Sequence, residues 1–132
     1  MMEKFEFNGE TFTKGDVAND APEIIKWAVN RVKPRANKCL ENSGKMAQET
    51  GAKMVEGYLV TVFHDKEEVE CVGHVWNDYQ GSQFDISANL INDESVKENY
   101  YFPHKAYEFS DALKQTHPFL LGRNVWFLAP TS

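Results

Sequence analysis

The chain has 132 residues and a formal net charge of −6. This length fits one domain, 1–132, with enough residues for a hydrophobic core. The acidic balance argues against non-specific binding to nucleic acid or to an anionic membrane surface. The apolar runs are too short to cross a bilayer, and the first residues lack a signal-peptide pattern. We therefore expect a cytoplasmic protein with no nucleic-acid or membrane partner, in which both cysteines stay reduced.

The first quarter of the chain predicts a hairpin and then a helix. Polar and apolar residues alternate across 3–14, and the Asn-Gly pair at 8–9 is a favoured two-residue turn. Residues 15–20 predict a loop. Pro22 suits the first turn of a helix, and apolar residues at helical spacing extend this helix to Val32.

A second helix is predicted from Asn37, a good N-cap, to a stop at Gly51. Cys39 falls in its first turn, where free N–H groups and the helix dipole favour a thiolate. A lone cysteine at a helix start is more often a small buried residue than a nucleophile. Gly44 disfavours a helix interior by about 1 kcal/mol relative to Ala, and close packing would explain its presence.

The rest of the chain predicts a mainly antiparallel sheet. β-Branched and aromatic residues predict three strands in a meander, at 55–64, 69–77 and 82–86. Beyond Asn89 the signals weaken to a short helix at 110–115 and a last strand at 124–128. We expect an α+β fold in which the helix carrying Cys39 packs on the sheet. The N-terminal hairpin would extend the sheet or cover its edge, and the last strand would close the other side.

The strand pattern places a histidine and a carboxylate together. Side chains alternate along a strand, so His74 and Trp76 project from one face. A four-residue loop at 78–81 would set His74 directly opposite Asp85, with Cβ atoms roughly 4.5–5.5 Å apart. The imidazole would then donate one N–H to the carboxylate and offer its other nitrogen as a base to Cys39.

The same residues follow an ordered set of motifs. Cys39 opens a helix that ends at Gly51, Gly57-Tyr58 lies on the next strand, His74-x-Trp76 on the one after, and Phe84-Asp85 ends the last. This order, over about 38–87, resembles the transglutaminase-like core of the papain-like cysteine peptidase superfamily. It is also similar to short phage-encoded proteins. The resemblance implies a nucleophile Cys39, a base His74 and an orienting Asp85. The chain departs from the family at Asn37, where a Gly is frequent.

The leading hypothesis is a cysteine-dependent enzyme that hydrolyses an amide or transfers an acyl group, acting on a protein or peptide-like substrate without a cofactor. The backbone N–H of Cys39 would contribute to an oxyanion hole, and Asn37, Asn42 or Trp27 would supply the second donor. Asn42 is equally explained as an exposed residue of the first helical turn. Trp76 would shield the His74–Asp85 pair from water or serve as a plain core aromatic.

Other classes stay open. A noncatalytic binding protein could keep this fold and hold a protein partner, and a structural protein could use the trio as a buried polar network. A zinc site from Cys39, Cys71 and His74 would need two cysteines on converging faces. Strand alternation points Cys71 away from His74, so we expect no metal.

Overall fold

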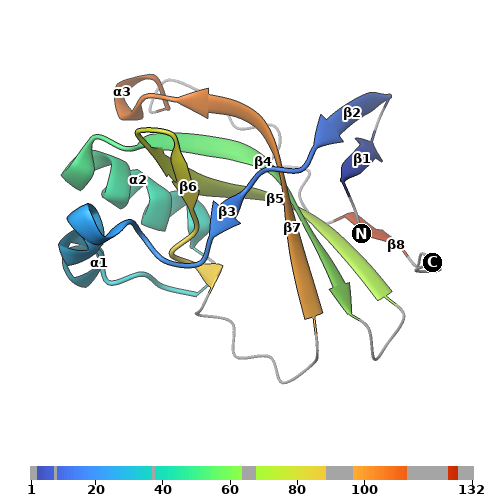
Figure 1. The fold of residues 1–132 in the computed structure, drawn as a ribbon, viewed down its shortest axis with the longest axis horizontal. Helices are drawn as coiled ribbons and strands as arrows, with labels where there is room; N and C mark the ends of the chain where they lie inside the picture. Colours follow the sequence, from blue (N-terminus) through green and yellow to red (C-terminus); the bar gives the residue numbers. More distant parts are fainter. Residues whose placement is uncertain are drawn as a thin grey trace.

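The computed structural model describes residues 3–7, 9–36, 38–63, 68–88, 97–112 and 125–127. Within these ranges the chain is α+β, as expected, with a two-stranded sheet and a mixed six-stranded sheet ordered β3-β6-β5-β4-β7, in which β8 also pairs with β5 (Figure 1). The elements in chain order are β1 (Lys4–Phe7), β2 (Glu10–Thr13), β3 (Val17–Ala18), η1 (Glu23–Ile25), α1 (Lys26–Val32), α2 (Cys39–Thr50), β4 (Lys53–Phe63), β5 (Glu68–Tyr79), β6 (Ser82–Phe84), β7 (Lys97–Tyr107), α3 (Phe109–Ala112) and β8 (Val125–Phe127).

The long antiparallel pair β4–β5 organises the molecule. The two strands pair without a break from Lys53↔Asp78 to Phe63↔Glu68. β-Branched and aromatic residues dominate β4, and almost all of its side chains are buried, which is typical of a central strand covered on both faces. On one side of β4, Met54 packs under α2, while Tyr58 and Val60 pack under the β1–β2 hairpin. These two coverings lie at opposite ends of the molecule (Figure 1).

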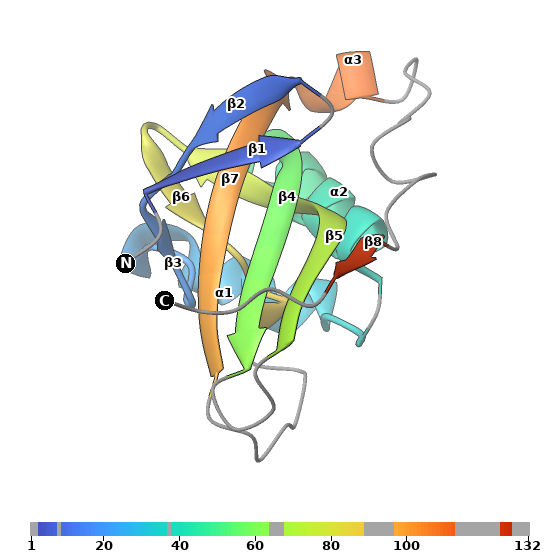
Figure 2. The same ribbon diagram turned by 90° about the vertical axis from the view of Figure 1, so that its right-hand side faces the viewer.

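The N-terminal hairpin forms as predicted but does not extend the main sheet. β1 and β2 pair only with each other among the described strands, with Phe5 opposite Phe12. Both rings are buried against Tyr58 and Phe102, and Figure 2 shows the hairpin crossing over β4 and β7. The hairpin therefore covers a face of the sheet, because its two phenylalanines need an apolar surface to bury against.

The turn between β5 and β6 is tighter than the expected four-residue loop, so that expectation is wrong. Tyr79 pairs with Ser82, and only Gln80 and Gly81 remain in the turn, with φ of 53° and 91°. Two positive φ values define the type I′ geometry that matches the twist of a hairpin. The register consequently differs by two residues from the predicted one. An even shift keeps His74 and Asp85 on the same side of the sheet but makes them diagonal neighbours.

Two strands lie where the sequence predicted none. The eleven-residue β7 pairs along β4, with an irregularity between Glu56 and Gly57, and β3 pairs in parallel with β6. Polar residues and Pro103 weaken the strand pattern in the sequence of β7. Proline cannot donate a hydrogen bond to a neighbouring strand, so it argues against a strand, although it is tolerated at edges and bulges. α3 begins within one residue of its predicted start, and 113–115 lie outside the described residues. β8 pairs with β5, the strand that carries His74.

No helix in the described ranges is long and apolar enough to cross a membrane.

Candidate active site

Cys39 is the first residue of α2. Lys38 occupies the N-cap position without a side-chain cap, and Asn37, the predicted cap, lies outside the described residues. The helix ends at Gly51 in the left-handed conformation, as predicted. Its buried face carries Met46 and Ala47, and this packing brings the helix start against the sheet. Cys39 therefore lies in the first turn of a twelve-residue helix, the turn whose backbone N–H groups have no partner within the helix.

The middle of β5 is open to this helix start. On the side away from β4, the described part of β5 pairs with β8 at 69–71 and with β6 at 77–79. The backbone of Val75, between these two segments, hydrogen-bonds the Cys39 sulfur. The gap in strand pairing thus gives Cys39 access to His74, the residue before Val75 on β5.

His74 and Asp85 form the central contact of the site. His74 Nε2 lies 2.8 Å from Asp85 Oδ2, and the side chains are 12% and 2% exposed. Asp85 follows directly on β6, and its other oxygen, Oδ1, accepts the backbone N–H of Ser87 at 3.0 Å. Because Nε2 is engaged with the carboxylate, Nδ1 is the ring nitrogen left to face Cys39.

The charges of the three groups support one another. Burial opposes ionisation of Cys39, but hydrogen bonding and charge from His74 outweigh it and hold the pKa of the thiol below its usual value. Burial also opposes the imidazolium, yet the Asp85 carboxylate and Cys39 raise the pKa of His74 to about 10. Despite its burial, Asp85 has a lowered pKa because His74, Tyr101 and Ser87 stabilise the anion. Each of these shifts favours the charged form of its group: the thiolate of Cys39, the imidazolium of His74 and the carboxylate of Asp85.

The ring of Trp76 lies against the imidazole of His74. Trp76 is almost fully buried and stacks on His74, with centroids 6.1 Å apart and an interplanar angle of 26°. Its indole N–H donates to Gln83 Oε1 at 2.7 Å. Trp76 also packs with Val55 in the core. Trp76 was expected either to shield the His74–Asp85 pair from water or to be a plain core aromatic. Its position fits both interpretations, since the ring lies in the core and against His74.

Tyr101 of β7 is a site neighbour that the sequence reasoning missed. Its hydroxyl donates to Asp85 Oδ2 at 2.7 Å, and its ring lies 6.2 Å from His74 and 5.1 Å from Trp76. The available signal was the aromatic run at 100–102, which favours a strand. That run carried no information about distance from Asp85.

Asn42 is buried, so its interpretation as an exposed residue is wrong. Its Oδ1 accepts the N–H of Arg35, and its Nδ2 donates to the Arg35 carbonyl and to Ser87 Oγ. Both amide hydrogens are engaged, which leaves Asn42 no donor for an oxyanion and corrects that part of the prediction. Asn42 instead ties α2 to the turn that holds Asp85.

The second oxyanion donor stays a prediction. Trp27 lies on α1 and is 50% exposed, and Asn37 falls outside the described residues. Cys71 is buried among the aromatic side chains under the hairpin. It lies three residues before His74 on β5 and therefore projects from the opposite face of the strand. Among the described residues, no three His, Cys, Asp or Glu side chains are grouped in a way that could hold a metal ion.

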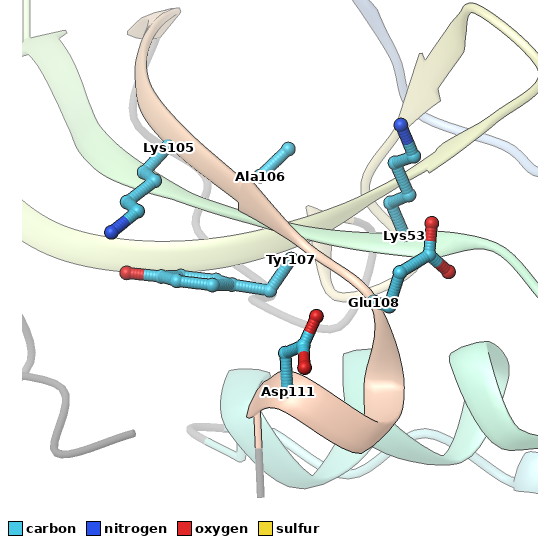
Figure 3. Close-up of a pocket in the computed structure, with 6 residues that line it drawn as sticks. All are labelled: Lys53, Lys105, Ala106, Tyr107, Glu108 and Asp111. Atoms are coloured by element: carbon cyan, nitrogen blue, oxygen red, sulfur yellow. The ribbon is translucent and has the colours of Figure 1, made fainter. Parts of the chain in front are cut away.

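Two surface hollows in the described part of the chain lie apart from the trio. One, with a volume of about 320 Å³, lies between the end of β7 and α3, where Lys105 and Tyr107 form one wall beside Glu108 and Asp111 (Figure 3). A second, of about 470 Å³, lies by the turns at 50–53 and 78–81. Neither is lined by Cys39, His74 or Asp85, so the chemistry of the trio, and not the depth of a hollow, identifies the candidate site.

Comparisons of this chain with protein-family models, with curated proteins and with solved structures found no significant match. The interpretation of the site therefore depends on its residues and their geometry.

Proposed function

We propose that this chain is a cysteine-dependent enzyme of transglutaminase-like type that hydrolyses an amide or transfers its acyl group. Cys39 is the nucleophile, and His74 is the general acid and base. Asp85 orients His74 and stabilises its imidazolium form. The substrate class is a protein or peptide-like amide. The observation that carries this proposal is the 2.8 Å His74–Asp85 contact beside a helix-start cysteine whose pKa is lowered.

The chemistry follows from the charges. The Cys39 thiolate attacks the amide carbonyl carbon, and the new C–S bond forms as the carbonyl oxygen takes up negative charge. The N–H groups at the start of α2 stabilise that charge. The imidazolium of His74 gives its proton to the leaving amine, the C–N bond breaks, and a thioester on Cys39 remains. Neutral His74 then takes a proton from water or an amine, which attacks the thioester and releases the thiolate.

The test is the pH dependence of alkylation at each cysteine, measured by peptide mass spectrometry after short exposure to iodoacetamide. An unperturbed thiol titrates near about 8.5, so rapid labelling of Cys39 well below that pH is expected. Cys71 is the internal control, because burial and the charge of Glu70 raise its pKa to about 12. His74→Ala should slow Cys39 labelling at pH 6.5 by about tenfold or more. The control is His104→Ala, which should not slow it, because His104 of β7 contacts Glu10 of β2.

An activity assay on the same variants is the second test of the proposed function. Cys39→Ala and His74→Ala should each abolish amide cleavage or acyl transfer from a peptide library, while Cys71→Ala should retain most of it. Equal loss in all three folded variants would contradict the assignment.

A noncatalytic binding protein is the second candidate, and the location of the two hollows away from the trio favours it. In that case Cys39 would label slowly with an ordinary pH profile. Capture of the same protein partner by the wild-type chain and by Cys39→Ala would then support binding without catalysis.

A further inference from the structure

Tyr101 reaches the Asp85 carboxylate from a strand that is not adjacent to the histidine strand. It lies on β7 opposite Leu59 of β4, and β4 separates β7 from β5. The N–H of Gly15 donates to the Tyr101 carbonyl at 2.7 Å, so its backbone is held from both sides. The side chain is buried and its hydroxyl donates to Asp85 Oδ2, the same oxygen that faces His74 Nε2.

We propose that Tyr101 is a positioning residue that holds Asp85 ionised and aimed at His74 in the candidate active site. This inference rests on the proposed function and deepens it. Asp85 Oδ1 is held by Ser87 N–H, and Oδ2 receives two donors, from His74 and Tyr101. With one oxygen fixed by the backbone and the other by two side chains, the carboxylate plane cannot rotate away from the imidazole without losing a hydrogen bond in a buried site.

Packing alone does not account for the hydroxyl. The ring of Tyr101 contacts Trp76 edge-on, and a phenylalanine would fill the same space. A buried hydroxyl is unfavourable unless it is hydrogen-bonded, and this one is bonded to the residue that orients the proposed base. Burial and the nearby Asp85 charge also raise the pKa of Tyr101, so the hydroxyl stays a neutral donor across the physiological range.

The groups that face Asp85 define how its titration would change. His74 faces it from β5 and Tyr101 from β7, the Ser87 N–H lies on its own turn, and the charge of Cys39 acts from α2. Removing the Tyr101 hydroxyl leaves one donor fewer on a buried anion, so Asp85 takes up a proton at higher pH. Once Asp85 is neutral, its charge no longer opposes the Cys39 thiolate, but the buried imidazolium loses its counter-charge. The hydrogen bond and charge of His74 act on Cys39 more strongly than the charge of Asp85, so the loss of the imidazolium decides the direction and the pKa of Cys39 rises.

The experiment compares Tyr101→Phe with Tyr100→Phe. Tyr100 is the next residue of β7, and its hydroxyl bonds Glu98 instead of Asp85, so its variant is a matched hydroxyl deletion. The readout is the pH profile of Cys39 alkylation between pH 4 and 9 on chains whose circular dichroism matches wild type. We expect Tyr101→Phe to move the acid-side midpoint up by about one pH unit, and Tyr100→Phe to leave it unchanged.

Two further variants keep the inference testable. In an Asp85→Asn chain, adding Tyr101→Phe should change Cys39 reactivity less than twofold, because the hydroxyl would have no carboxylate to hold. If Tyr101→Phe does not fold, 3-fluorotyrosine incorporated at position 101 keeps the shape with a stronger donor and should move the midpoint down.

The outcomes separate this inference from the proposed function. In one outcome, the alkylation midpoint of wild-type Cys39 lies below that of an ordinary thiol, but neither change at position 101 moves it. This result would overturn the role of Tyr101 and leave the proposed function standing. An ordinary wild-type midpoint would instead overturn the proposed function itself.

Discussion

Cys39 and Cys71 have opposite chemistry because their surroundings differ. Cys71 is enclosed by apolar side chains and beside Glu70, and both conditions favour the neutral thiol. Cys39 is also largely enclosed, but His74 and the Val75 backbone favour the thiolate. At the scale of single residues, reactivity is therefore decided by which charge lies next to the sulfur.

The His74–Asp85 pair predicts how stability depends on pH. The pKa of His74 is raised above its ordinary 6.5, so its contribution is complete below about pH 6.5 and is lost as the pH rises toward about 10. The pKa of Asp85 is lowered below its ordinary 3.8, so its contribution is complete above that value and is lost in stronger acid. In a Cys39→Ser background, which removes the opposing titration of the thiol, the melting temperature should peak between about pH 4 and 6.5.

Thermal unfolding at pH 5.5 and pH 9 checks this prediction. The Cys39→Ser chain should unfold at lower temperature at pH 9. Adding Asp85→Asn should remove most of that difference. A difference that persists at full size in the double variant would assign the pH dependence to other groups.

At the scale of elements, two glycines have opposite roles. A Cβ on Gly57 would lie 2.2 Å from the Phe102 carbonyl oxygen and 2.9 Å from Pro103 Cα, because β7 approaches β4 closely at its irregularity. A Cβ on Gly44 of α2 would meet Met54 and Phe109 only at ordinary contact distance, 3.8 and 3.9 Å. The expectation that close packing explains Gly44 is therefore wrong, whereas Gly57 is required by the β4–β7 contact.

Alanine substitution at the two positions should have effects of opposite sign. Gly57→Ala should destabilise the fold by roughly 3 kcal/mol, since backbone atoms must move to admit the methyl group. Gly44→Ala should be neutral or stabilise by up to about 1 kcal/mol, since alanine favours the helix. Urea denaturation measures both. A Gly57→Ala chain as stable as wild type would contradict the close approach of β7.

At the scale of the whole molecule, the hairpin covering and the candidate site are separate units of packing. Phe5 and Phe12 of the hairpin pack on Tyr58 and Phe102 of the sheet. Trp76 and Tyr101 belong to a different cluster, with Val55. Stability and thiol chemistry should therefore be separable by substitution.

Phe12→Ala tests this separation. Loss of a buried phenyl ring should lower the free energy of unfolding by roughly 3–5 kcal/mol, while the exposed Ile24→Ala should change it by less than about 0.5 kcal/mol. In conditions where both variants remain folded, the pH profile of Cys39 alkylation should match wild type. A shifted profile in Phe12→Ala would mean that the hairpin supports the site directly.

The sequence by itself determined the features that depend on neighbouring residues. The pairing of β1 with β2, the stop of α2 at Gly51 and the strands around Val60 and Val75 follow from local backbone preference and side-chain periodicity. Strand alternation also placed His74 and Asp85 on one side, and this held despite the wrong loop length because the register shift was even.

Only the tertiary structure decided which distant groups meet at Asp85. Tyr101 and Asn42 come from elements that no short-range pattern connects to the Asp85 turn, and β7 itself was concealed by its polar residues and Pro103. A side-chain hydroxyl or amide is compatible with either solvent or burial, so the residue type alone does not predict whether Tyr101 or Asn42 is buried or which group it bonds. Its partner is selected when the sheet closes, because a buried polar group must then find a hydrogen bond within the fold.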